Sequence, residues 1–259
     1  MKSLFTLSLI AFFILGNSFI PIKKHKLPKA LRGCKAVIYI PVNEAGQGDF
    51  YIFQHEVSNL IYLEFLYMLR GEQRLEELSV AEIDSLNWIM SPIKNPQPWV
   101  ENYHKTKPNY PAVNITKAGA EAYCQWLSNI WNNQQDDFFV TFRLPLKAEW
   151  QYAFASDHHW LYPWGGPNPY NAKNCYLGNY KEADVVQGPA PVNSFKPNEF
   201  GLYNMSGNVA EWVKDDDAAY GGHWNISSEK GQRDDAYDVV KSSPYVGFRP
   251  IMTFTDRGS

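Results

Sequence analysis

From Trp160 to Pro250 the chain has almost no helical period. It is rich in Gly, Pro, Asn and aromatic residues, with short strand-like pieces between them. Gly and Asn tolerate positive φ and favour turns, so this half of the chain is predicted to be irregular. The stretch GLYNMSGNVAEW (201–212) is the clearest case, because its apolar residues fit no single period. We expect a buried loop there, which must find partners for its backbone carbonyls.

The start of the mature chain, in contrast, carries regular patterns. AVIYIPV (36–42) and GDFYIFQHEVS (48–58) are predicted to form two strands of a hairpin. Ser58 is predicted to be the N-cap of a helix, because apolar residues follow it at helical spacing. That helix is expected to end near Gly71.

Two further helices are predicted from their start signals. Thr116 is expected to cap a helix whose apolar residues recur at three- and four-residue steps. Pro145 suits the start of another helix within 141–155. The stretch 72–112 mixes an acidic, helix-like part with a Pro-rich loop, and we assign no structure to it.

Length and composition restrict the function classes. A chain of 259 residues with 45% hydrophobic and 15% aromatic content suits one large domain. Its formal net charge of −3 gives no concentrated basic face for phosphate binding, so no nucleic-acid partner is expected.

The first 36 residues indicate export. A short basic start, an apolar run from Leu4 to Leu15 and small residues at 16–18 predict a signal peptide over 1–18. The apolar run is shorter than a membrane-spanning helix requires. Residues 19–36 are basic, and both a solvated linker and contact with an anionic membrane surface remain open for them. The domain itself is predicted over 37–259, in a periplasmic, outer-membrane-associated or secreted protein.

The chain contains three cysteines, Cys34, Cys124 and Cys175. An odd count allows at most one intramolecular disulfide, and the wide spacings match no zinc pattern. Cys124 lies on the expected buried side of its helix, where a free cysteine acts as a small hydrophobe.

Eight ordered sequence blocks carry a family resemblance: HEVSNLIYLEF, YPAVNITKAGAEAYCQWL, FRLPLKAEWQYAFA, YPWGG, NCYLGNY, PVNSFKPNEFGLYNMSGNVAEWVKD, GGHW and GFRP. Together they resemble the formylglycine-generating enzyme family, also called sulfatase-modifying factors. The resemblance implies a single α+β domain related to C-type lectins. Such a domain has a small twisted antiparallel sheet, a few helices and much irregular structure.

The resemblance also implies calcium. In the first implied site, Asn204 and Glu211 give side-chain oxygens, and Gly207 and Val209 give backbone carbonyls. In the second, Asn174 and Asp184 give side chains, and Cys175 and Val186 give carbonyls. Calcium takes six to eight oxygen ligands at flexible geometry, which suits such sets. The alternative is that these Asn and Asp residues form turns without a metal.

The sequence departs from the family at its catalytic signature. Active members oxidise a substrate cysteine with copper and oxygen, using two cysteines between a GGSW-like block and the final GFR. Thiolates are the natural Cu(I) ligands. Residues 225–250 of this chain contain no cysteine, and His223 replaces the serine of that block. We therefore expect neither copper nor a catalytic residue of the family type.

The functional expectation is an exported, non-catalytic protein with a binding or scaffolding role in the cell envelope. The closest analogy is to family members that lack these cysteines, such as gliding-motility and secretion-associated lipoproteins. Trp212, His223 and Trp224, with the 225–246 loop, are predicted to rim the binding surface for an envelope protein, peptide or glycan. The alternative is an oxidase of the formylglycine-generating type that modifies sulfatase cysteines through an atypical centre.

Overall fold

The computed structural model describes residues 37–43, 46, 48–133, 138–156, 158, 160–183, 187–239 and 241–256. The predicted signal peptide, the basic linker and Cys34 lie outside these residues. In the described part of the chain, no helix has the length and apolar character needed to cross a bilayer.

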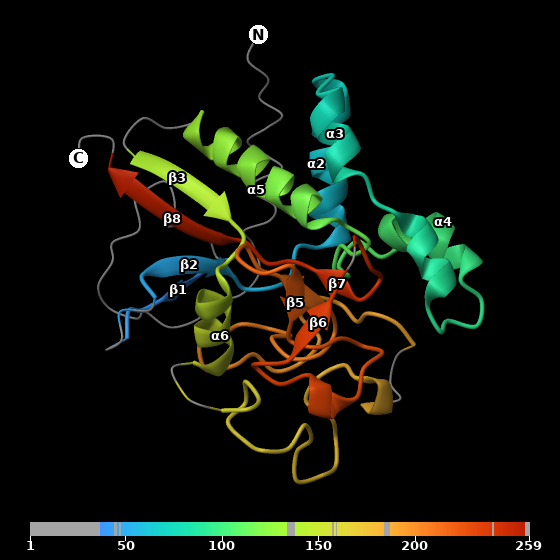
Figure 1. The fold of residues 1–259 in the computed structure, drawn as a ribbon, viewed down its shortest axis with the longest axis vertical. Helices are drawn as coiled ribbons and strands as arrows, with labels where there is room; N and C mark the ends of the chain where they lie inside the picture. Colours follow the sequence, from blue (N-terminus) through green and yellow to red (C-terminus); the bar gives the residue numbers. More distant parts are fainter. Residues whose placement is uncertain are drawn as a thin grey trace.

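The first sheet joins the two ends of the domain (Figure 1). Its order is β1 (Val37–Ile40), β2 (Phe50–Phe53), β8 (Ile251–Asp256) and β3 (Phe138–Arg143), and every neighbouring pair is antiparallel. The predicted hairpin is confirmed as β1 and β2, with shorter strands than the sequence pattern indicates. Because the last strand lies between β2 and β3, the sheet forms only when the C-terminal segment returns to the start of the domain.

Helices pack against this sheet and against one another. They are α2 (Asn59–Gly71), α3 (Leu75–Ala81), α4 (Gln97–Thr106), α5 (Lys117–Asn132) and α6 (Lys147–Ala155), with a 3-10 helix, η2 (Ser85–Met90), before α4. The largest core cluster contains Phe65 of α2, Tyr123 of α5 and Phe248 near the C-terminus. Cys124 belongs to this cluster, as predicted for a small buried hydrophobe, and burial raises the pKa of its thiol.

The helix starts differ in how well the sequence predicts them. Thr116 is confirmed as a cap, since its Oγ1 accepts the Gly119 N–H at 2.9 Å. Ser58 does precede α2, but its side chain makes no capping hydrogen bond. Its backbone forms a bridge with Pro111 instead. Helix α6 begins two residues after Pro145, with the Glu149 carboxylate accepting the Leu146 N–H.

The second half is irregular, as predicted, around a small second sheet. The sheet order is β6 (Ala236–Asp238), β5 (Ala218–Tyr220), β4 (Ala210–Trp212) and β7 (Val246–Gly247), with β4 and β7 parallel. Among the described residues of this region, the loops are interrupted by two short 3-10 helices, η3 (Lys181–Ala183) and η4 (Ser228–Lys230). The structure thus has the mixed α+β class that the sequence predicts.

Replacing Thr116 with alanine tests the confirmed cap. The substitution leaves the Gly119 N–H without its side-chain acceptor, so we expect a loss of about 1 kcal/mol in the free energy of unfolding. Thr106→Ala is the matched control, because that exposed hydroxyl bonds only a carbonyl within α4. Urea unfolding of both variants measures the difference, and equal stabilities would contradict the cap assignment.

Candidate functional site

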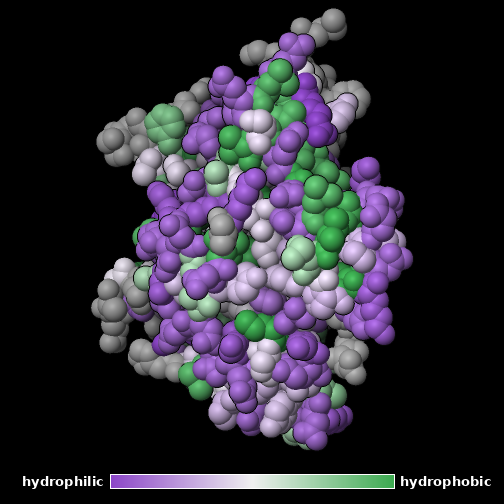
Figure 2. Space-filling view, turned by 45° about the vertical axis from the view of Figure 1, so that its right-hand side comes forward, coloured by the Kyte–Doolittle hydropathy of each residue, from purple (hydrophilic) through white to green (hydrophobic). Residues whose placement is uncertain are grey.

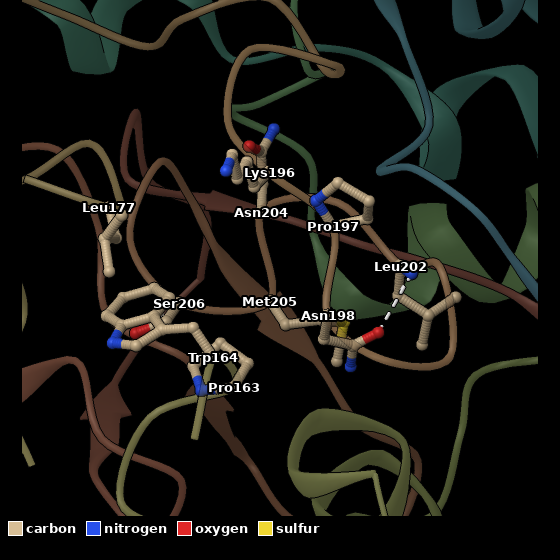
Figure 3. Close-up of a pocket in the computed structure, with 10 residues that line it drawn as sticks. All are labelled: Pro163, Trp164, Leu177, Lys196, Pro197, Asn198, Leu202, Asn204, Met205 and Ser206. Carbon is tan, nitrogen blue, oxygen red and sulfur yellow. Dashed lines mark hydrogen bonds between the residues drawn. The ribbon is translucent and has the colours of Figure 1, made fainter. Parts of the chain in front are cut away.

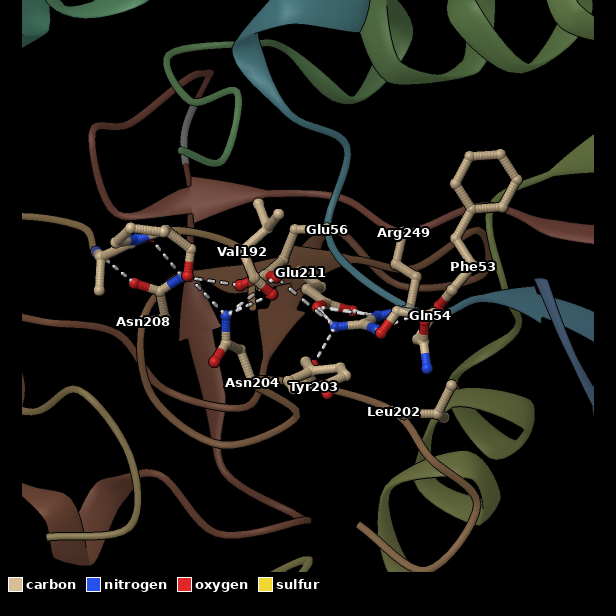
Figure 4. Close-up of polar contacts among 12 residues, drawn as sticks. Phe53, Gln54, Glu56, Val192, Leu202, Tyr203, Asn204, Asn208, Glu211 and Arg249 are labelled. Carbon is tan, nitrogen blue, oxygen red and sulfur yellow. Dashed lines mark hydrogen bonds and ion pairs between the residues drawn. The ribbon is translucent and has the colours of Figure 1, made fainter. Parts of the chain in front are cut away.

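A buried ion pair lies between the two sheets. Arg249 and Glu211 are 0% and 1% exposed, and Nη2 of the arginine is 2.7 Å from Oε1 of the glutamate (Figure 4). Nε of Arg249 donates to both carboxylate oxygens at 3.1 Å, and Trp150 Nε1 donates to Oε2 at 2.8 Å. The remaining guanidinium hydrogens go to three backbone carbonyls, those of Phe53, Gln54 and Tyr203. All five N–H donors of the arginine are therefore used.

A second carboxylate lies beside this pair. Glu56 is 2% exposed, and its Oε2 is 4.0 Å from Nη2 of Arg249. It accepts hydrogen bonds from Asn208 Nδ2 at 2.8 Å and Asn204 Nδ2 at 3.2 Å. Burial raises the pKa of Glu56 to about 7; the nearby Glu211 adds to the shift, while Arg249 and Asn208 oppose it. The centre contains two carboxylates and one guanidinium. The hydrogen bonds from Asn204 and Asn208 therefore provide much of the stabilisation of the Glu56 carboxylate.

Both asparagines adopt positive φ, at 53° for Asn204 and 64° for Asn208. The Asn208 amide has partners on both sides, because its Oδ1 also accepts the Ala190 N–H at 2.7 Å. The Asn204 amide is oriented by acceptors alone: Glu56 and the carbonyls of Pro191 and Val192 all face Nδ2. Its Oδ1 is buried and has no hydrogen-bond partner among the described residues.

These contacts test the first implied calcium site. The free Oδ1 of Asn204 fits a calcium ligand, since a buried oxygen without a partner is costly. Gly207 and Val209 lie in the same buried turn. Glu211, however, does not fit in this arrangement, because its two oxygens accept four contacts from Arg249 and Trp150 and a carboxylate offers about four lone-pair sites. Glu211 is therefore occupied by Arg249 and Trp150, and the calcium ligands Asn204, Gly207 and Val209 remain a prediction.

The second implied site is only partly described. Asn174 and Cys175 lie in an exposed turn, with Asn174 at φ 57°. The Cys175 carbonyl accepts the Asn171 N–H at 2.9 Å. Asp184 and Val186 lie outside the described residues, so this ligand set remains a prediction.

The predicted binding surface is wrong. Trp212, His223 and Trp224 are 2%, 4% and 3% exposed, so none of them rims an open groove. The Trp212 indole N–H donates to the Ile115 carbonyl, and that of Trp224 to the Pro244 carbonyl. The large rings of Trp212 and Trp224 complete the core between the loops, and both of their indole N–H groups find a backbone acceptor.

His223 is buried within an aromatic cluster. Its ring stacks on Tyr245 with centroids 4.5 Å apart and meets the edge of Tyr237 at 4.7 Å. Nδ1 accepts the Asn225 N–H, which makes the neutral ring carry its proton on Nε2. Burial lowers the pKa of His223 to about 3. Nε2 has no hydrogen-bond partner among the described residues.

A small pocket opens beside Asn204 (Figure 3). Its lining is mixed, and comprises Pro163, Trp164, Leu177, Lys196, Pro197, Asn198, Leu202, Asn204, Met205 and Ser206. Sequence reasoning did not identify it, because its walls come from separate loops without periodicity. The same reasoning missed Glu56, Asn208 and Arg249 as partners, since the HEVS and GFRP blocks that carry two of them give no signal that they meet.

The buried imidazole of His223 predicts a pH effect on stability. The pKa of His223 is lower in the folded state than in the unfolded state. The contribution of its neutral imidazole to the free energy of unfolding is therefore present above about pH 6.5 and is lost as the pH falls toward 3. Between about pH 7.5 and 5 this loss is about 2 kcal/mol. His223→Phe should therefore lose about 2 kcal/mol less than the wild type over that range.

Urea unfolding at the two pH values measures this difference. Tyr245→Phe serves as the control, because it alters the same aromatic cluster without adding or removing a group that titrates there. The prediction does not hold if His223→Phe and the wild type show the same change in unfolding free energy.

Comparison with known proteins places the chain in a family. The sulfatase-modifying factor enzyme 1-like domain matches residues 29–253. The mouse formylglycine-generating enzyme is 35% identical over 115 residues, covering 41% of this chain and 27% of that protein. The Thermomonospora curvata enzyme is 35% identical over 117 residues, covering 42% and 34%. A bovine protein named inactive C-alpha-formylglycine-generating enzyme 2 is 32% identical over 115 residues, covering 42% and 34%.

These matched regions span about a third or less of the curated relatives' own lengths. Solved structures share the fold at lower identity. PvdO from Pseudomonas aeruginosa has a TM-score of 0.56 at 18% identity, covering 83% of this chain and 90% of that one. Treponema denticola variable protein 1 has a TM-score of 0.55 at 17% identity, covering 83% and 92%. The match over residues 29–253 shows that this chain belongs to the sulfatase-modifying factor family, whose fold is that of the formylglycine-generating enzymes.

Proposed function

We propose that this chain is an exported, non-catalytic member of its family with a binding or scaffolding role in the cell envelope. The observation that carries the proposal is the absence of cysteine from residues 225–250, where the enzymes of the family hold their copper thiolates. A relative named as inactive shows that the family includes members without the activity. Export is supported by the signal-like sequence of residues 1–18.

The described cysteines do not offer a substitute centre. Cys124 is buried in the core beside α5, and Cys175 is exposed on a loop. Within the described ranges, no group of three or more His, Cys, Asp or Glu side chains is arranged to hold a metal ion. A thiolate pair for Cu(I) would need two cysteines at one point.

The second candidate function is an oxidase of the formylglycine-generating type with an atypical centre. The names of the curated relatives favour it, as does the unpaired Nε2 of the buried His223. Imidazole is a good copper ligand, but a single one does not replace two thiolates.

A peptide assay distinguishes the two candidates. A cysteine-containing sulfatase-motif peptide is incubated with the protein, copper, calcium and oxygen, and its mass is measured, with an active family enzyme as the positive control. We expect no conversion of the cysteine to an aldehyde. Conversion would overturn the non-catalytic proposal, and its loss in His223→Phe would identify the centre.

Calcium remains a proposal for the turn that contains Asn204, Gly207 and Val209, with Glu211 assigned to Arg249 instead. An ion that binds only the folded state raises the melting temperature, so a chelator should lower it. Asn204→Ala should have a lower melting temperature that no longer responds to the chelator. Gln232→Ala is a control in an irregular loop outside the turn. An unchanged melting curve with chelator, together with no calcium in metal analysis, would show that the assignment is wrong.

A further inference from the structure

The segment from α3 through η2 exposes a group of apolar side chains. Five of them are between 45% and 85% exposed: Leu75, Val80, Leu86, Ile89 and Met90. Figure 2 shows apolar surface gathered on the upper part of the face that comes forward from the side of α3 and α4. Single exposed apolar residues are common, but a gathered group marks an interaction site. We call these five residues the apolar patch.

Buried contacts on the inner side of η2 hold the apolar patch in place. Trp88, in the middle of η2, is fully buried, with its ring centroid 4.9 Å from that of Trp99 and 4.8 Å from that of Tyr103. Asn87 Nδ2 donates to Ser242 Oγ at 2.8 Å, which ties η2 to the loop before β7. Because η2 is anchored on its inner side, the exposed residues of the same short helix are held in place. A partner would not have to order this part of the chain on binding.

The stretch of chain that carries the apolar patch is acidic. Residues 72–90 contain five carboxylates, Glu72, Glu76, Glu77, Glu82 and Asp84, against one arginine, a net charge of −4. That arginine, Arg74, is already paired with Glu72 and Glu77. Glu76 lies one helical turn before Val80, so both are on the same face of α3.

The negative charge of residues 72–90 determines which kind of partner could bind the apolar patch. An anionic membrane surface attracts basic segments and would be repelled here. A second copy docked through the same face would bring the two acidic rims together, which costs free energy. A segment with apolar residues on one side and Lys or Arg at its edges would satisfy both the patch and its rim.

We propose that the apolar patch and its acidic rim bind a basic amphipathic helix of a partner protein. Apolar side chains at three- and four-residue spacing would cover the patch, and flanking basic residues would face the carboxylates of residues 72–84. The inference rests on the proposed binding role and names the chemistry of the partner.

A model peptide tests it with the full chain. The probe is a fluorescent helix of about 14 residues with Leu on one face and Lys on the other, titrated by anisotropy. We expect saturable binding that weakens as salt rises from about 0.01 to 0.15 M, because the Debye length falls from about 30 to 8 Å. The double substitution Leu86→Ser with Met90→Ser should weaken binding roughly tenfold. Glu76→Gln with Glu82→Gln should weaken it mainly at low salt.

Matched controls use exposed residues elsewhere. Val42→Ser with Leu161→Ser removes apolar surface away from the patch, and Glu199→Gln with Glu229→Gln removes charge away from the rim. Both control pairs should bind the peptide like the wild type. A permuted, non-amphipathic peptide of the same composition should bind more weakly.

Four results would overturn the proposal: equal affinity for the permuted peptide, tighter binding of a Lys→Glu peptide, equal loss in patch and control variants, or no binding. A patch variant that turns a dimer into a monomer in sedimentation would instead assign the surface to a second copy. Tighter peptide binding after Lys23, Lys24, Lys26 and Lys29 are changed to Gln would assign it to the chain's own basic segment. The aldehyde assay is independent of all these results, so it alone decides the non-catalytic proposal.

Discussion

The buried pair of Arg249 and Glu211 fixes how the two halves of the domain meet. The guanidinium holds the carbonyls of Phe53 and Gln54 at the end of β2, the carbonyl of Tyr203 in the irregular half, and a carboxylate of β4. Removing one partner of such a pair leaves a buried charge uncompensated, which typically costs about 3–5 kcal/mol. Because Arg249 lies two residues before the start of β8, the same contacts place the strand that closes the first sheet.

The irregular half is stable because side chains replace the hydrogen bonds that helices and strands would supply. Asn208 binds the Ala190 N–H and carbonyl, and Asn198 donates to the carbonyls of Ala153 and Phe154 at the end of α6. Position 207 requires glycine for two reasons: its φ is +81°, and a Cβ there would lie 2.8 Å from the Asn179 carbonyl oxygen. Loops held in this way can differ in sequence between relatives while the scaffold persists, which is why the fold alone does not assign a function.

The residues that the sequence predicts as a binding surface are buried. His223 and Trp224 both pack on Tyr245 inside an aromatic cluster, and burial keeps the imidazole neutral. The surface proposed to bind a partner lies instead on α3 and η2, in the stretch to which the sequence pattern assigns no structure. An acidic, partly helical sequence gives no indication that Trp88 turns inward and leaves its neighbours exposed.

By itself the sequence determined the hairpin, the Thr116 cap and the irregular second half, because each follows from local residue preferences and short-range spacing. The class of the fold followed from the resemblance of eight ordered sequence blocks to a known family. The sequence also determined the absence of a thiolate pair from residues 225–250. Only the tertiary structure decided that Glu211 pairs with Arg249, that Glu56 joins them through Asn204 and Asn208, and that the predicted binding residues are buried. Glu56 is 152 positions from Asn208, and Arg249 is 196 from Phe53. Contacts over such separations depend on how packed elements exclude water, and no local pattern in the chain encodes them.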